Sequence, residues 1–268
     1  MWSDFMDNEN NIKRAELHVH TIFSEQQKAS IEVLNAIEHA KELGLSSIAF
    51  CDYRSVDSFS EIMNVDDKIK SGIKVIYGAE LPFETTTQTI KTRGLSLTLL
   101  AKNKKGIKAL QELAATMIQD EYNKACKIIN IDILKRNREN LLIGSTSYSG
   151  EIFNEIKWWW DFPKDFKKMA EFYDFIEISP VKCAKDKSIN ERIIELSQAF
   201  KIPVVATSNA KHLTIDTAAL AEYSFFAERY NHIYSTDELL EEFRYLGEDI
   251  AYDVVIKNPN KLVELINY

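Results

Sequence analysis

Apolar runs of strand length alternate along this chain with segments whose apolar residues recur at helical spacing. The strand-like runs lie at residues 15–21, 46–52, 74–81, 95–103, 140–147, 172–180 and 202–209. Most of them are followed by a stretch with helical periodicity, which is typical of βα units in a largely parallel sheet or barrel. The pattern therefore predicts an α/β fold with about seven strands, most of them followed by a helix.

Several helix boundaries are signalled by local sequence. Ser30 is expected to cap a helix that extends to about Leu43, before Gly44. A further helix is expected over residues 56–69. Towards the C-terminus, the serine and glutamate of STDELLEEF have the spacing of a capping box, and the end of the chain is predicted to be helical. Because no proline- or glycine-rich linker interrupts the pattern, residues 15–268 are expected to form one domain after an N-terminal tail, residues 1–14.

Polar residues lie where the predicted strands end. In α/β folds the C-terminal ends of the strands converge, and functional groups gather there. The alternation therefore predicts a pocket lined by residues that follow the strands, which are His18, His20, Asp52, Tyr53, Glu80, residues 145–147 and residues 207–209. Because His18 and His20 are two residues apart on a strand, they are expected to point to the same side, where paired imidazoles are good ligands for Zn, Mn or Fe.

The net charge, the cysteine pattern and the length of the apolar runs disfavour several classes of function. The 268 residues carry a net charge of −8, so autonomous binding to DNA is not expected, since phosphate contacts need clustered cations. The three cysteines form no CxxC pair, which disfavours a structural zinc site and suits a reducing compartment. Because no apolar run approaches the length of a membrane span, a cytoplasmic protein without membrane contact is expected.

Several segments in order carry a family resemblance. LHVHTIFS, AFCDYRSVDSF, KVIYGAEL and LTLLAKN are followed by IPVVATSNAKHL and STDELLEEFRYLGEDIAYDVVIKNPNKLVELI. Together they resemble the PHP (polymerase and histidinol phosphatase) domain, and within it the PHP domain of PolC-type bacterial DNA polymerase III alpha subunits. The resemblance extends from about Ala15 to the C-terminus. It implies a distorted (β/α)7-type PHP barrel with a helical C-terminal end.

The chain departs from these polymerases in organisation. Their PHP domain contains an inserted proofreading exonuclease, whereas the corresponding place here is the short stretch FETTTQTIKTRG, residues 83–94, which is expected to form a hairpin or loop. The palm, fingers and DNA-binding modules also have no counterpart in the sequence. We therefore expect that this chain alone cannot polymerise DNA.

The resemblance also implies a metal cluster at the barrel mouth, and the chain matches it only in part. His18, His20 and Glu80 match family ligands. The positions of other ligands hold Gln26 or Gln27, Tyr53, Ser96, Ser147, Asn209 and Lys211, with His212 one place too late. An ammonium has no lone pair for a metal, so Lys211 is hypothesised to pair with Glu80 or Asp52 instead. At most one Zn, Mn or Fe ion is expected, and a metal-free site is equally compatible with the sequence.

Three functions remain open at this point. The first is a scaffold or binding module related to DNA replication, because degenerate PHP domains in the family are thought to stabilise the polymerase and to contact proofreading factors. Its partners would be replication or proofreading proteins. The second is a divergent metal-dependent phosphoesterase or nuclease that uses His18, His20 and Glu80. The third is a binding protein for a phosphorylated ligand near Lys211.

Overall fold

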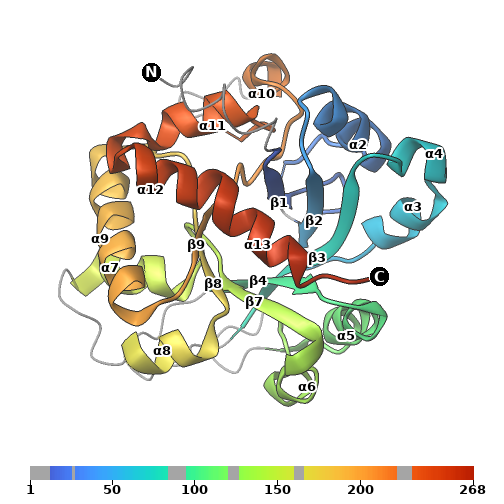
Figure 1. The fold of residues 1–268 in the computed structure, drawn as a ribbon. Coiled ribbons are helices and arrows are strands. Elements are labelled where there is room, and N and C mark those ends of the chain that lie inside the picture. The colour runs from blue at the N-terminus through green and yellow to red at the C-terminus, as the bar shows by residue number, and fades with distance from the viewer. Residues whose placement is uncertain (1–12, 26–27, 84–94, 120–126, 160–165, 222–230) are drawn as a thin grey trace.

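A seven-stranded sheet with helices packed around it forms the centre of the molecule (Figure 1). The computed structural model describes residues 13–25, 28–83, 95–119, 127–159, 166–221 and 231–268. The strands, in sheet order, are β1 (Ala15–Val19), β2 (Ser47–Tyr53), β3 (Lys74–Pro82), β4 (Ser96–Ala101), β7 (Leu141–Ser145), β8 (Phe175–Ile178) and β9 (Val204–Ala206). The number and positions of these strands confirm the sequence-based prediction.

Strand direction is parallel except around β4. This strand pairs antiparallel with both β3 and β7, whereas the other neighbours in the sheet are parallel. The sheet is thus largely parallel, as predicted. A second, two-stranded sheet, β5 (Ile118–Gln119) with β6 (Lys127–Ile128), was not predicted. The expected hairpin or loop at residues 83–94 falls almost entirely outside the described residues.

The two ends of the large sheet meet at the C-terminal ends of their strands. Val19, at the end of β1, forms a parallel bridge with Ala210, which lies beyond the end of β9. The His20 N–H donates to the Ala210 carbonyl at 2.8 Å, and the Ala210 N–H donates to the His18 carbonyl at 3.1 Å. The sheet therefore curls into a distorted barrel in which, among the described residues, one backbone bridge joins β1 to the segment after β9.

Helices pack around the curled sheet, and α13 (Asn258–Glu264) crosses in front of the strands in this view (Figure 1). The other described α-helices are α2 (Val33–Glu42), α3 (Ser58–Asn64), α4 (Asp67–Lys70), α5 (Lys104–Ala115), α6 (Ile131–Arg136), α7 (Glu151–Trp159), α8 (Phe166–Phe172), α9 (Ala184–Phe200), α10 (Ile215–Ala221), α11 (Thr236–Phe243) and α12 (Glu248–Tyr252). Among the described helices, none combines the length and the apolar composition needed to cross a bilayer. The C-terminal end of the chain is helical, as predicted.

Two helix boundaries differ from the predictions. Helix α2 begins at Val33 after an extended residue without a capping side chain, and the Ser30 hydroxyl lies 2.9 Å from His212 Nδ1 instead. The helix expected over residues 56–69 is divided into α3 and α4, and Asp66 caps the second of them. The capping box of α11, by contrast, is present, with both of its hydrogen bonds.

The two faces of the sheet bury different side chains. The outer face packs under the helices and forms the larger apolar core. A smaller core on the inner face fills the half of the barrel at the N-terminal ends of the parallel strands, where Leu262 and Ile266 from the end of the chain pack against it. The strand residues of this inner core are Ala15, Leu17, Ala49, Cys51, Ile76, Leu100, Leu142, Phe175 and Val205. Because strand side chains alternate, the same inner face presents Glu80, Thr98 and Glu177 in the other half of the barrel.

Candidate metal centre

A β-bulge in β1 directs both predicted histidines into the barrel. Glu16 pairs with Ile48 and Val19 pairs with Phe50, so three steps along β1 oppose two steps along β2. Leu17 accordingly packs in the inner core, whereas Val19 packs in the outer core. A bulge reverses the alternation at one point and re-aims the side chains that follow it. His18 and His20 therefore both face inwards, which confirms that they share a side.

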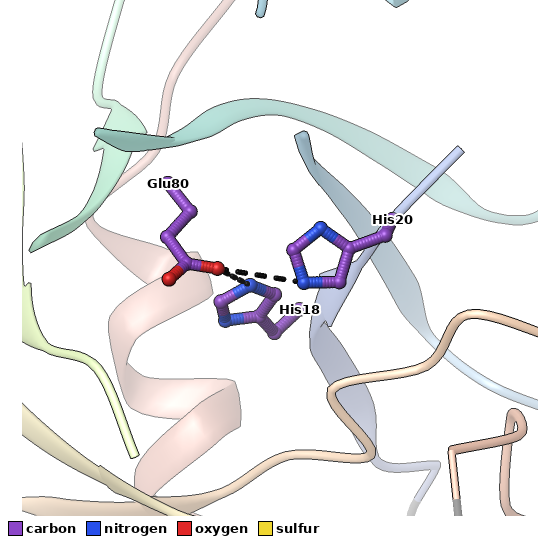
Figure 2. A group of neighbouring side chains, drawn as sticks. All are labelled: His18, His20 and Glu80. Carbon is purple, nitrogen blue, oxygen red and sulfur yellow. Dashed lines mark ion pairs between the residues drawn. The ribbon is translucent and has the colours of Figure 1, made fainter. Parts of the chain in front are cut away.

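Glu80 joins the two histidines from β3 (Figure 2). Its Oε2 lies 3.5 Å from His18 Nε2 and 3.5 Å from His20 Nε2. The three candidate ligand atoms lie within 4.8 Å of one another, and all three side chains are buried. Among the residues that the structure describes, this is the one group of three potential metal ligands. It consists of the three residues that the sequence suggested as metal ligands.

Glu177, on β8, is a site residue that sequence reasoning missed. Its Oε2 lies 2.9 Å and its Oε1 3.2 Å from His18 Nδ1, and the side chain is fully buried. His18 Nε2, on the other side of the ring, has no hydrogen-bond partner among the described residues. The available signal was a glutamate inside the apolar run FIEI, since a charged residue in a buried strand normally has a specific partner.

Two hydroxyl groups hold the Glu80 carboxylate in place. Ser96 donates a hydrogen bond to Oε1, and Ser149 donates to the same oxygen at 2.8 Å. Ser96 occupies a position where the family resemblance placed a ligand. Its described role here is to orient a neighbouring carboxylate.

His20 takes part in a chain of uncharged hydrogen-bonding groups. Its Nδ1 lies 3.0 Å from Ser24 Oγ, which accepts the Tyr53 backbone N–H at 2.7 Å. Its Nε2 lies 3.0 Å from Asn209 Oδ1, and the Asn209 amide donates to Ser147 Oγ at 3.3 Å. The His20 proton can reside on Nε2 and be donated to Asn209. It can instead reside on Nδ1 and be donated to Ser24, and Nε2 then accepts either the N–H of a reversed Asn209 amide or, in its place, a cation.

Burial and neighbouring charges shift the pKa values of the three candidate ligands in different directions. Burial alone would lower the pKa of His18, but Glu177 and Glu80 outweigh it and raise that pKa to about 10. Burial and the neighbouring His18 lower the pKa of His20 to about 3. Burial alone would raise the pKa of Glu80, but the two histidines and the Ser96 hydroxyl hold it at about 2. Without a metal, the site is thus an imidazolium between two carboxylates, beside a neutral imidazole.

Asp52 and Lys211, two further residues of the predicted pocket, lie near enough to the histidines for their charges to interact. Asp52 accepts hydrogen bonds from the Thr21 backbone N–H at 2.5 Å and from the Thr21 hydroxyl at 2.9 Å, which fixes the turn after β1. Lys211 lies near enough for its charge to contribute to the lowered pKa of His20. His212 is buried with its Nδ1 beside Ser30, and it is not part of the three-ligand group. Pairing of Lys211 with Glu80 or Asp52 remains a hypothesis.

The donor set fits one divalent cation. Two imidazole nitrogens and one carboxylate oxygen suit Zn, Mn or Fe. His18 Nε2 makes no hydrogen bond among the described residues and faces Glu80 Oε2 at 3.5 Å, with which it forms an ion pair when the ring is protonated. A cation between His18, His20 and Glu80 would take the place of that proton.

Comparisons with known proteins identify related chains. The chain is 29% identical over 199 residues to the PolC-type DNA polymerase III of Staphylococcus haemolyticus, and 29% identical over 202 residues to that of Staphylococcus aureus. Each match covers 66% of this chain and 14% of the relative, so the chain spans only a small part of the length of these polymerases.

Solved structures share the general arrangement at low identity. A lesion-specific endonuclease from Pyrococcus furiosus is 19% identical, with a TM-score of 0.46 over 74% of this chain and 48% of that chain. The protein PsfC from Pseudomonas syringae is 15% identical, with a TM-score of 0.45 over 74% of this chain and 76% of that chain. These likenesses are too distant to inform the chemistry.

A protein-family model matches most of the length of this chain. The model described as the PHP domain matches residues 16–179, which is more than half of the 268 residues. The matched segment extends from the second residue of β1 to just past β8, and it includes His18, His20, Glu80 and Glu177. This chain belongs to the PHP domain family.

Proposed function

We propose that this protein is a non-hydrolytic PHP module that acts as a scaffold or binding domain in a DNA replication context, with a reduced site that holds at most one divalent cation. One observation carries the proposal. Ser96, Ser147 and Asn209 occupy positions where the family resemblance places further ligands. Ser96 donates to Glu80, Asn209 donates to Ser147, and Asn209 also contacts His20. Groups that would bind further metals instead stabilise the protein's own polar network.

The chemistry of phosphoester hydrolysis supports this proposal. A cluster of metals in such a site supplies a hydroxide and neutralises the developing charge on the phosphate. His18, His20 and Glu80 provide three ligands, which is a set for a single ion. The remaining polar residues hold the two histidines and the glutamate in fixed positions, and that role suits structural rigidity as well as catalysis.

The relatives support the proposed replication context. The matched proteins are PolC-type DNA polymerases III. Because this chain is acidic, with a net charge of −8, we infer that it contacts replication or proofreading proteins rather than DNA. Purified PolC-type polymerase and its proofreading factors are the partners to test, by pull-down with the tagged full chain. Absence of stable binding to any of them would contradict this context.

Metal content and hydrolysis test the reduced site. The full chain is stripped with a chelator, loaded separately with Zn, Mn and Fe, and analysed for metal per chain and for hydrolysis of a chromogenic phosphodiester. We expect at most one ion per chain and no hydrolysis above that of His20→Ala. Turnover that is lost in His20→Ala would overturn the non-hydrolytic role, and two or more ions per chain would overturn the reduced site.

A divergent phosphoesterase is the second candidate, and the geometry around His18 favours it. Glu177 holds Nδ1 while Nε2 faces Glu80 without a hydrogen-bond partner among the described residues, as in a histidine prepared to bind a metal. A bound cation would act there as a Lewis acid on a phosphate oxygen. The hydrolysis assay above distinguishes this candidate from the scaffold, because it requires turnover that depends on His18, His20 and Glu80.

A further inference from the structure

The carboxylate behind His18 has a role that the three candidate ligands do not explain. We propose that Glu177 is the positioning residue of the site: it fixes the His18 ring with its proton on Nδ1 and thereby presents Nε2 to a single divalent cation shared with Glu80 and His20. The inference rests on the reduced, single-cation site proposed above.

The direction of the hydrogen bond follows from the chemistry of the partners. An ionised carboxylate only accepts hydrogen bonds, so His18 Nδ1 must carry a proton when it lies 2.9 Å from Glu177 Oε2. The Thr98 hydroxyl, 3.4 Å from the same nitrogen, is the one other described group near it, and it is much less favourably placed. A neutral imidazole with a proton on Nδ1 has its lone pair on Nε2. Glu177 therefore selects the tautomer that a metal requires.

The position of Glu177 is fixed by the strand that carries it. Ile176 and Ile178, its neighbours on β8, pack in the outer core, and Phe175 packs in the inner core. The Glu177 side chain is 0% exposed and reaches across the inside of the barrel to a residue 159 positions earlier in the chain. Functional groups held on regular strands are positioned more precisely than groups on loops.

The opposite side of the His18 ring shows where the cation would lie. Glu80 Oε2 is 3.5 Å from His18 Nε2 and 3.5 Å from His20 Nε2, and no hydrogen bond joins it to His18 Nε2. The two histidines are thus supported differently: a buried carboxylate orients His18, whereas a serine and an asparagine contact His20. This difference predicts that removing the Glu177 carboxylate weakens cation binding through His18 specifically.

Cobalt(II) binding to the full chain tests the inference. Cobalt(II) is the probe because its visible absorption reports the ligands that surround it, independently of any activity. Glu177→Met removes the acceptor in a side chain of similar length, whereas Glu177→Gln keeps an acceptor oxygen without the charge. We expect Glu177→Met to lower cobalt affinity by roughly 10–100-fold, with Glu177→Gln intermediate. The matched control is Glu151→Gln, a fully buried glutamate that accepts from the Tyr173 hydroxyl at 2.9 Å, and it should bind as wild type.

A second measurement separates positioning from loss of folding. Nitrogen-15 spectra of the histidine rings in the cobalt-free and zinc-loaded protein report which nitrogen carries the proton. Loaded wild type should show His18 protonated on Nδ1 only, and Glu177→Gln should retain that state more fully than Glu177→Met. Wild-type cobalt affinity in both Glu177 variants would refute the inference, and so would a wild-type protein that binds no cobalt at millimolar concentration. Neither outcome affects the scaffold proposal, which fails on hydrolysis instead.

Discussion

His18 lies in β1 and His20 directly follows it, yet the surroundings of the two imidazole rings favour opposite charge states. His18 lies between the carboxylates of Glu177 and Glu80, which stabilise its imidazolium. His20 is buried beside the positive charge of His18 and contacts only a hydroxyl and an amide, so its neutral form is favoured. Two steps along the chain therefore separate a charged ring from a neutral one.

These opposite shifts predict how pH affects the stability of the metal-free protein. The pKa of His18 is raised to about 10, so its contribution is complete below 6.5 and is lost as pH rises through 10. The pKa of His20 is lowered to about 3, so its contribution is complete above 6.5 and is lost as pH falls from there towards 3. We expect these two groups together to give maximal stability near pH 6.5.

Urea denaturation from about pH 4 to about pH 9 measures this dependence. His20→Gln cannot titrate, so its stability should fall less than that of wild type on the acid side, and the difference between the two curves isolates the His20 contribution. His39→Gln, which removes a histidine from α2 outside the site, is the control. Parallel curves for wild type and His20→Gln would contradict the assignment.

Side-chain identity predicted the three candidate ligands but not the residues that orient them. The alternation along the strand indicated the paired histidines, and the resemblance to the PHP family singled out Glu80 among the polar residues at the ends of the predicted strands. Glu177 could not be assigned a partner, because its contact with His18 depends on how the barrel brings β8 opposite β1. The contact between Asn209 and His20 could not be predicted for the same reason, because it forms only when the sheet curls.

At the scale of elements, the bulge in β1 decides which side chains face the barrel interior. Without the extra residue between the Glu16 and Val19 pairings, Leu17 and Val19 would share a face. The alternation of the sequence predicted the strand, yet a bulge depends on pairing with β2 and left no local signal. Strand β4 is a similar case: its apolar run predicted a strand, but a strand pattern has no direction, so the antiparallel pairing was not predicted.

Close packing between β7 and β8 gives a prediction about one glycine. A Cβ added at Gly144 would lie 2.3 Å from two ring carbons of Phe175, which is fully buried. We expect Gly144→Ala to lower the free energy of unfolding by about 1–3 kcal/mol, because a well-packed core cannot accept an added methyl group without strain. Urea denaturation measures the change.

The double variant provides the control for this clash. Phe175→Leu removes the ring atoms that the new methyl group would meet. Gly144→Ala should therefore cost less in the Phe175→Leu background than in wild type, and the two changes should be non-additive. Strict additivity would show that the cost arises elsewhere.

At the scale of the whole molecule, the end of the chain completes the inner core. Leu262, on α13, is 4% exposed and packs with residues of several strands. Leu262→Ala should lower the free energy of unfolding by about 2–5 kcal/mol, as is typical for a buried leucine. Leu265, in the same segment but 57% exposed, is the matched control, and Leu265→Ala should change stability by less than about 0.5 kcal/mol. Equal effects of the two substitutions would contradict the described packing.

The overall charge gives a prediction about nucleic acid. With a net charge of −8, the chain should show no saturable binding to duplex DNA by fluorescence anisotropy at about 0.15 M salt. The measurement should be repeated with cation present, because one bound ion changes the site without changing the sign of the net charge. Tight, salt-dependent binding would require a basic surface that the composition does not suggest.

The closure of the barrel at Val19 and Ala210 has a consequence for how the protein is made. His20 and Asn209 are 189 positions apart, so a nascent chain cannot complete the site until most of it has left the ribosome. Contacts of such sequence separation form late and raise the contact order, which slows folding. Until then one edge of β1 lacks its neighbouring segment, and the unpaired backbone groups along that edge can pair with the wrong strand. The hydrogen bond between His20 and Asn209 is thus a marker of completed folding, because it forms only in a chain whose first strand has met the segment after its last strand.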